Sequence, residues 1–112
     1  MTRYLISFDD GAMIFPDEDL PDVAKAAHAV VDEAKAAGVW VTGGGVEGHE
    51  ASVVGADGSI TDLPYRGPGT HLGGFCIVDV PARAGALGWA AKFAVACRCA
   101  QEVRALGDDP NV

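Results

Sequence analysis

The sequence predicts a single α+β domain in which two helices pack on one sheet. Residues 19–38 and 81–98 have apolar residues at helical spacing, and short runs of strand-forming residues lie between and around them. The predicted order is strand, helix, strand, hairpin, strand, helix, strand, which is the ferredoxin-like βαβ-hairpin-βαβ pattern. A chain of 112 residues is long enough for one such domain and short for two.

The first half of the chain starts with a strand over residues 4–8 (YLISF), which the sequence Asp9–Asp10–Gly11 ends. Asp19 is a suitable N-cap for the first helix, Pro21 is tolerated in a first turn, and Gly38 ends the helix. The apolar positions that predict its buried stripe are Leu20, Val23, Ala27, Val30 or Val31, Ala34 and Ala37.

The middle of the chain contains a second strand and a small hairpin. Residues 39–42 (VWVT) form the strand, and we expect the three glycines at 43–45 to permit a bulge or close packing at a sheet end. Residues 51–54 and 59–61 form the hairpin, with its turn at Asp57–Gly58. Residues 62–72 are rich in proline and glycine, which predicts an irregular surface loop.

The second half repeats the strand–helix–strand order. Residues 74–80 (GFCIVDV) form a strand, residues 81–98 a helix, and residues 101–106 the last strand. Trp89 and Phe93 are an i, i+4 pair beside the predicted buried stripe of this helix. That stripe comprises Leu87, Ala90, Ala91, Ala94 and Cys97. We therefore assign residues 1–107 to the domain and residues 108–112 to a C-terminal tail.

Both faces of the central strands are apolar. In residues 4–8, Leu5 points away from the face that carries Tyr4 and Ile6, and in residues 74–80 Phe75 and Ile77 point away from the face of Cys76. The helices can cover one face only, and a large exposed apolar face is a liability. A second copy of the sheet is the simplest cover, so the sequence predicts a homodimer with two sheets face to face.

Composition excludes several classes of protein. The formal net charge of −8 disfavours nucleic acid as a partner, because phosphate contacts need clustered Lys and Arg. No apolar run is long enough to span a membrane, and the first residues lack a signal peptide's pattern, so we expect a cytoplasmic protein. Cys76, Cys97 and Cys99 fit a reducing compartment and do not have zinc-site spacing, so we expect neither a metal nor a cofactor.

Several short segments, in their order and spacing, resemble the YCII-related (YciI-like, DGPF-domain) proteins. The matching segments are Tyr4–Leu5–Ile6, Gly38 to Gly44, Asp62–Leu63–Pro64–Tyr65, Leu72–Gly73–Gly74–Phe75, Trp89–Ala90–Ala91 and Glu102–Val103–Arg104. The sequence departs from the family at Leu63, where the family has glycine, and at Tyr65, where it has phenylalanine.

The resemblance implies a dimeric α/β barrel built from ferredoxin-like subunits. Some relatives suggest lyase, isomerase or dehalogenase chemistry on small molecules with a His/Asp pair and no organic cofactor. Others are encoded beside, or fused to, alternative sigma factors. The chain is therefore expected to be either a small acid/base enzyme or a non-catalytic dimeric binding or regulatory module.

His28 is the candidate catalytic residue. It borders the apolar stripe of the first helix, and its spacing to Gly38 is similar to that of the histidine proposed for the family. An imidazole there can act as general acid or base near neutral pH, although a boundary histidine with an ordinary hydrogen bond has the same pattern. Asp10, just after the first strand, is its expected partner, and Asp9 is the alternative.

The expected binding pocket lies between the sheet and the first helix. Phe8, Trp40 and Phe75 would line its apolar wall. Asp62 and Tyr65 mark the loop after the hairpin, which is expected either to close over the pocket as a lid or to serve as an ordinary turn.

Overall fold

The structure, a computed structural model, describes residues 1–46, 50–64 and 72–112 of the chain. Its elements are β1 (Thr2–Asp9), the short 3-10 helix η1 (Asp17–Asp19), α1 (Leu20–Ala36), β2 (Trp40–Gly45), β3 (Glu50–Val54), β4 (Ile60–Pro64), β5 (Leu72–Val80), α2 (Arg83–Cys97) and β6 (Glu102–Ala105). The predicted order of helices and strands is confirmed.

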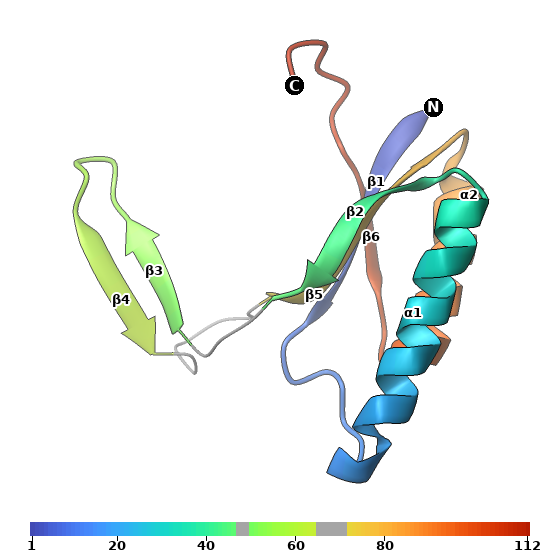
Figure 1. Cartoon of the computed structure of the whole chain (residues 1–112). Helices are drawn as coiled ribbons and strands as arrows, with labels where there is room; N and C mark the ends of the chain where they lie inside the picture. Colours follow the sequence, from blue (N-terminus) through green and yellow to red (C-terminus); the bar gives the residue numbers. More distant parts are fainter. Residues whose placement is uncertain (47–49, 65–71) are drawn as a thin grey trace.

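Four strands form one antiparallel sheet in the order β2-β5-β1-β6, and β3 pairs with β4 in a separate two-stranded sheet. Both helices lie on the same side of the larger sheet (Figure 1). This arrangement is a small α+β domain, compatible with a ferredoxin-like fold. None of the described helices is long and apolar enough to cross a bilayer.

The core lies between this sheet and the two helices. Alternate residues of β1 and β5 point into it, and Ile6 and Val78 are the largest side chains that are fully buried. The other buried members of the core cluster are Tyr4, Val30, Cys76, Val80, Ala86, Ala90, Phe93 and Ala96. Burying one such aliphatic or aromatic side chain stabilises the fold by roughly 1.5–3 kcal/mol.

The rotation of α2 differs from the prediction. The helix buries Ala86, Ala90, Phe93, Ala96 and Cys97, whereas Leu87, predicted to be buried, is 46% exposed. Apolar residues of α2 occur on all sides of the helix, so their spacing alone does not indicate which side is buried. Phe93 has the largest side chain among the buried residues of α2, and its ring centroid lies 6.3 Å from that of Trp40.

Asp19 precedes α1 as predicted, but its side chain does not cap the helix. Its backbone is already helical because η1 leads directly into α1, and no cap hydrogen bond forms. The carboxylate accepts a hydrogen bond from Nη1 of Arg98 at 2.8 Å instead. Arg98 ends α2 in the left-handed conformation, with φ +57°. Asp19 therefore joins the start of one helix to the end of the other.

Strand β2 continues through all three glycines at 43–45, three residues beyond the predicted end. Its register with β5 shifts between Trp40 and Thr42, before the glycines, whereas residues 43–45 pair with β5 in regular register, so the glycines themselves form no bulge. A Cβ atom placed on Gly43 would lie 2.7 Å from Cβ of Cys76 and 2.7 Å from the carbonyl oxygen of Phe75. The other predicted role of these glycines, close packing, is confirmed at Gly43.

The hairpin turn spans Gly55 to Ser59 rather than two residues only. The amide of Gly58, at φ +87°, donates to the carbonyl of Gly55 at 2.9 Å. The Ser59 amide donates to Oδ1 of Asp57, which lowers the pKa of that carboxyl.

The prediction of a loop over residues 62–72 is wrong for residues 62–64, which belong to β4. Strand pairing extends to Pro64, at a sheet edge where proline is tolerated. Residues 65–71 lie outside the described part.

The β3–β4 hairpin stands apart from the rest of the domain (Figure 1). It contacts no other helix or strand among residues 1–46 and 72–112. The radius of gyration is 15.7 Å, larger than the roughly 13 Å expected for a compact chain of this length. Apolar side chains on the hairpin remain open to solvent, with Val54 65% and Ile60 68% exposed.

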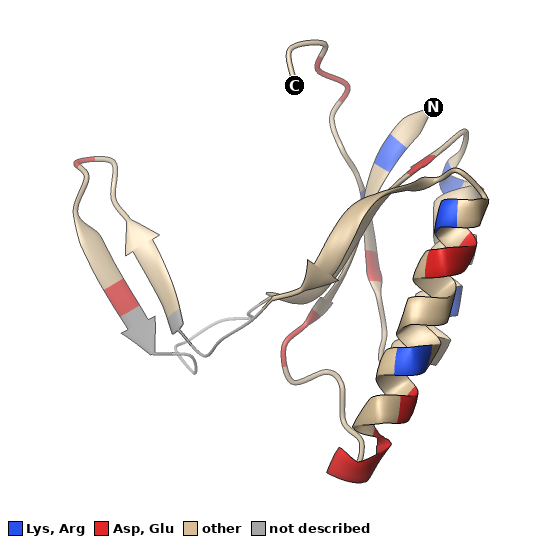
Figure 2. Cartoon of the chain, viewed as in Figure 1, with Lys and Arg blue, Asp and Glu red and all other residues tan. Residues whose placement is uncertain are grey.

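Acidic side chains gather at the start of the helical layer, at Asp17, Glu18 and Asp19, as Figure 2 shows. They lie at the end of α1 that carries the positive partial charge of the helix dipole. Lys92 of α2 forms an exposed ion pair with Glu33 of α1 and so links the two helices on their outer side. Pairs of this kind contribute little to stability in water.

Candidate functional site

A cavity of about 570 Å³ lies between α1 and the β2 side of the sheet. Its walls come from the end of β1, one face of α1, the strand β2, and parts of β5 and α2. Most of the lining is apolar, and the residues that define its shape are Ile6, Phe8, Val23, Val31, Trp40 and Phe93. This volume is in the range of cavities that bind small organic molecules.

Two adjacent stripes of residues on α1 face the core and the cavity. Val23, Val30 and Ala34 are buried. Ala24, His28, Val31 and Lys35 follow one another at intervals of four, three and four residues and line the cavity. The cavity is therefore bordered by the face of α1 that turns from the core toward β2.

His28 lies at the rim of the cavity and is exposed. Within the described residues its side chain forms no hydrogen bond or ion pair. The imidazole is thus open both to solvent and to a molecule in the cavity. This position differs from a boundary histidine that is fixed by an ordinary hydrogen bond.

The structure does not bring Asp10 into contact with His28. Asp10 is exposed just after β1, it does not line the cavity, and no hydrogen bond or ion pair between the two residues is present. Its backbone lies against β5, since a Cβ atom on Gly73 would be 2.9 Å from the Asp10 amide nitrogen. Asp9, the alternative partner, is half-buried and also lies outside the lining.

Phe8, Trp40 and Phe75 all line the cavity. The ring of Phe8 packs on Gly74, where a Cβ atom would come within 2.7 Å of it. The ring of Trp40 packs against the ring of Phe93 in a tilted arrangement, with an interplanar angle of 40°. β1, β2 and α2 therefore supply the aromatic residues Phe8, Trp40 and Phe93 to one hollow, whereas Phe75 borders it from a β5 position that alternates with the core residue Cys76.

The two loop residues are placed differently. Asp62 lies in β4, away from the cavity, and its Oδ1 accepts a hydrogen bond from Oγ of Ser52 at 2.5 Å across the hairpin. Tyr65 falls outside the described residues. Asp62 therefore has a structural contact within the hairpin.

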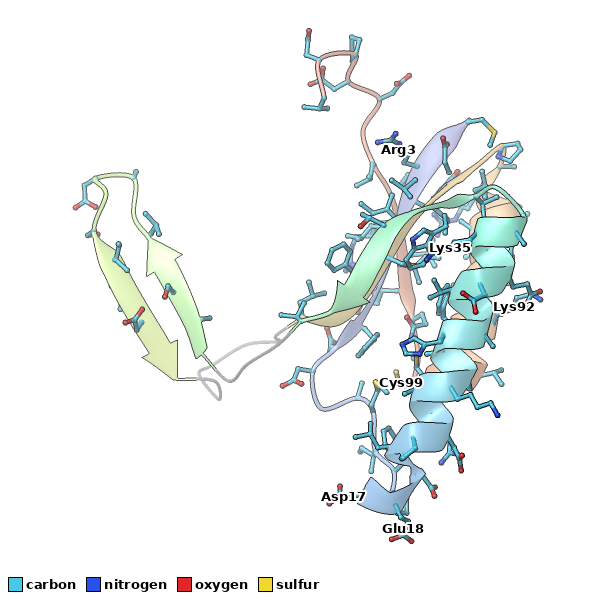
Figure 3. All side chains as sticks on the ribbon, in the orientation of Figure 1. Arg3, Asp17, Glu18, Lys35, Lys92 and Cys99 are labelled. Carbon is cyan, nitrogen blue, oxygen red and sulfur yellow. The ribbon has the colours of Figure 1, made fainter. Side chains whose placement is uncertain are left out.

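Lys35 is a lining residue that the sequence prediction missed. It is seven residues after His28, which places both on the same side of α1 two turns apart. Figure 3 shows its side chain on the side of α1 that faces β2. Thr42 of β2 and Gln101, before β6, add neutral polar groups. Among the residues described, no Asp or Glu lines the cavity.

Two buried thiols form part of the inner wall. Burial raises the pKa of Cys76 to about 12, with a smaller contribution from the nearby Cys97. Burial also raises the pKa of Cys97. Both groups are therefore neutral at neutral pH and behave as small apolar side chains. Within the described part of the chain, no cluster of three His, Cys, Asp or Glu residues is arranged to hold a metal.

A second hollow of about 450 Å³ lies at the opposite end of the sheet, between the start of β1 and the C-terminal tail. It contains Arg3 and Asp79, which are paired across β1 and β5. It has no aromatic lining residue and no histidine in the described part. The cavity beside α1 is the better candidate site for that reason.

No model of a known protein family matches the chain, and no curated protein matches it either. The resemblance to YCII-related proteins therefore stays a prediction from the sequence.

Proposed function

We propose that the chain is a YCII-related domain that binds a small organic molecule in the cavity beside α1 and performs acid/base chemistry on it with His28. The observation that carries the proposal is the position of His28 at the rim of an aromatic cavity of about 570 Å³. An imidazole that is open to a bound molecule can accept or donate a proton near neutral pH. No organic cofactor enters this chemistry.

Isomerisation, elimination and dehalogenation all suit such a site, because each can begin when a base removes a proton from carbon. The apolar wall of Phe8 and Trp40 would exclude water from the bound molecule and so strengthen the effect of His28. Asp10 is the proposed partner of the imidazole and Asp9 is the alternative, although neither carboxylate contacts His28 in this structure. Asp9 and Asp10 are the next two residues after Phe8 at the end of β1, and Phe8 lines the same cavity.

An NMR pH titration of His28 tests the pair. If Asp10 acts on the imidazole, the Asp10→Asn variant lowers the pKa of His28 relative to wild type, because a negative charge that favours the imidazolium is lost. Asp9→Asn is the matched variant one residue earlier and distinguishes the two carboxylates. Identical His28 titration curves in all three proteins would contradict the partnership and leave His28 as a lone base.

We also propose that two copies associate through the sheet face opposite the helices. Leu5, Phe75 and Ile77 lie on that face and are only half-buried in the single chain. No described helix lies on that face of the sheet, as Figure 1 shows. A symmetric contact between two such faces would bury both. A cytoplasmic location is part of this proposal, and the free thiols of Cys76, Cys97 and Cys99 suit a reducing compartment.

Light scattering on single variants tests the dimer. The variant Ile77→Asp puts a charge in the proposed interface and is expected to give monomers at micromolar concentration. Val95→Asp makes the same kind of change on α2, where the side chain is already 81% exposed, and is expected to leave the dimer intact. A wild-type protein that is monomeric at this concentration would refute the proposal.

The second candidate is a non-catalytic dimeric binding or regulatory module. The projecting hairpin favours it, since Val53, Val54 and Ile60 are open to solvent on an element without other contacts among the described residues. Surfaces of this kind often bind other proteins. A His28→Gln variant distinguishes the two functions, because it abolishes acid/base chemistry in the first and leaves binding through the hairpin unchanged in the second.

A further inference from the structure

We infer that the cavity selects a monocarboxylate with an apolar body, whose charge is bound by Lys35 and whose body lies beside His28. The inference rests on the proposed binding function of this cavity and adds a class of ligand to it. It follows from three features of the lining, which are its ionisable groups, its neutral thiols and its length.

The ionisable lining residues are cationic or neutral. The chain carries 16 Asp and Glu against 8 Lys and Arg, yet in the described residues none of the acids lines the cavity. Lys35 does line it, and it forms no ion pair with a described residue. A positive group at the edge of an apolar hollow favours a negatively charged ligand and disfavours a cation.

The inner wall adds no opposing charge. Cys76 and Cys97 keep their protons at neutral pH because they are buried. The remaining polar lining groups, on Thr42 and Gln101, are neutral hydrogen-bonding groups. An apolar ligand body therefore meets no charged group between the rim and the floor among the described residues.

The spacing along α1 sets the length of the ligand. Seven residues of helix span roughly 10 Å, so Lys35 and His28 lie at separate points along the rim. Helical side chains tilt toward the N-terminus, which carries the Lys35 ammonium back in the direction of His28. A carboxylate bound at Lys35 would thus place the atoms next to it in front of the imidazole, over Phe8 and Trp40.

Ligand binding is measured with octanoate, octan-1-ol and octylammonium, which share a chain and differ in charge. The fluorescence of Trp40 reports binding. The chain has two tryptophans, so the titrations use a Trp89→Phe background in which Trp40 alone remains. Fluorescence titrations at a pH where the histidines are neutral are checked by calorimetry. We expect octanoate to bind more tightly than octanol, and octylammonium to bind most weakly.

Variants of two lysines on the same helix identify the group responsible. We expect Lys35→Gln to weaken octanoate binding about tenfold and to leave octanol binding unchanged, because it removes a charge-assisted hydrogen bond. Lys35→Arg should restore most of the affinity. Lys25→Gln makes the same charge change on α1 outside the cavity lining and should have no effect.

The outcomes separate this inference from the function on which it rests. If octanol and octanoate bind equally, or if Lys25→Gln weakens octanoate as much as Lys35→Gln does, the inference is overturned while the cavity remains a binding site. If none of the three ligands binds by either method, the proposed binding function itself is refuted.

Discussion

Gly43→Ala is the substitution whose effect the structure defines best. The new Cβ atom would lie 2.7 Å from Cβ and 2.8 Å from Cα of Cys76, and 2.7 Å from the carbonyl oxygen of Phe75. Ordinary contacts of this kind begin at 3.4 Å, so β2 must move away from β5 by about 0.7 Å or more. Paired strands normally keep opposing Cβ atoms about 4.5–5.5 Å apart, so Gly43 and its partner Cys76 lie unusually close.

None of the three atoms can rotate out of the way, because each belongs to the backbone or is fixed directly to it. Overpacking of this kind costs about 1–3 kcal/mol of the free energy of unfolding. Gly44→Ala is the matched control, since a Cβ atom there meets nothing within 4 Å. That control should be neutral or slightly stabilising, because alanine reduces the conformational entropy of the unfolded chain.

Urea denaturation followed by circular dichroism, at equal protein concentrations, measures the difference. Thermal unfolding should agree, with a loss of about 4 °C per kcal/mol for a chain of this size. The expected order of stability is Gly44→Ala equal to or above wild type, and Gly43→Ala below both. If the two alanine variants are equally stable, then β2 does not approach β5 as closely at Gly43 as the structure has it.

Three further predictions concern the core and the end of α2. Phe93→Ala should lower the free energy of unfolding by about 3–5 kcal/mol in urea titrations, because it empties the core beside Trp40, whereas Val95→Ala at an exposed site should change it by less than about 0.5 kcal/mol. Arg98→Gly should be about 1 kcal/mol more stable than Arg98→Ala, since both lose the ion pair with Asp19 but only glycine relieves the left-handed backbone, and equal stabilities would contradict the φ of +57°. Because burial raises the pKa of Cys76 from 9.0 to about 12, the folded state holds this proton more tightly than the unfolded chain. Its stabilising contribution should be fully present below pH 9 and decline as the pH rises toward 12, and Cys76→Ala should make that decline shallower in urea titrations at several pH values.

The sequence predicts the sheet well because its strands have one strong local pattern. In β1 and β5, apolar residues occupy both faces. Ile6 and Val78 are buried on the helix side, and Leu5, Phe75 and Ile77, which alternate with them, are half-buried on the other side, as the pattern indicates. The order of elements followed from such local patterns. Glycines have no side chain, so a run of them shows no alternation between the two faces of a strand. The pattern therefore did not reveal that β2 extends through residues 43–45, beyond its predicted end.

Long-range contacts account for what the sequence did not predict. The rotation of α2 places Phe93 beside Trp40, a residue far from it along the chain. Lys35 becomes a cavity residue only because β2 returns beside α1. The position of His28 beside the buried stripe of α1 is a local feature, and the structure has this residue in the cavity lining. Its expected contact with Asp10 depends on how the chain leaves β1, which periodicity does not describe.

The hairpin also changes how the connection between β2 and β5 is understood. These two strands are neighbours in the sheet, and their ends are closed by pairing of Gly45 with Gly74 and by the amide of Val46, which donates to the carbonyl of Gly73. The β3–β4 segment is therefore an insertion into the loop of an ordinary antiparallel pair. Loop-closure entropy grows only slowly, by about 0.6 kcal/mol for each doubling of loop length. The domain thus carries a long projecting element at little cost to its core, and that element is free to differ in length and sequence while the four-stranded sheet stays the same.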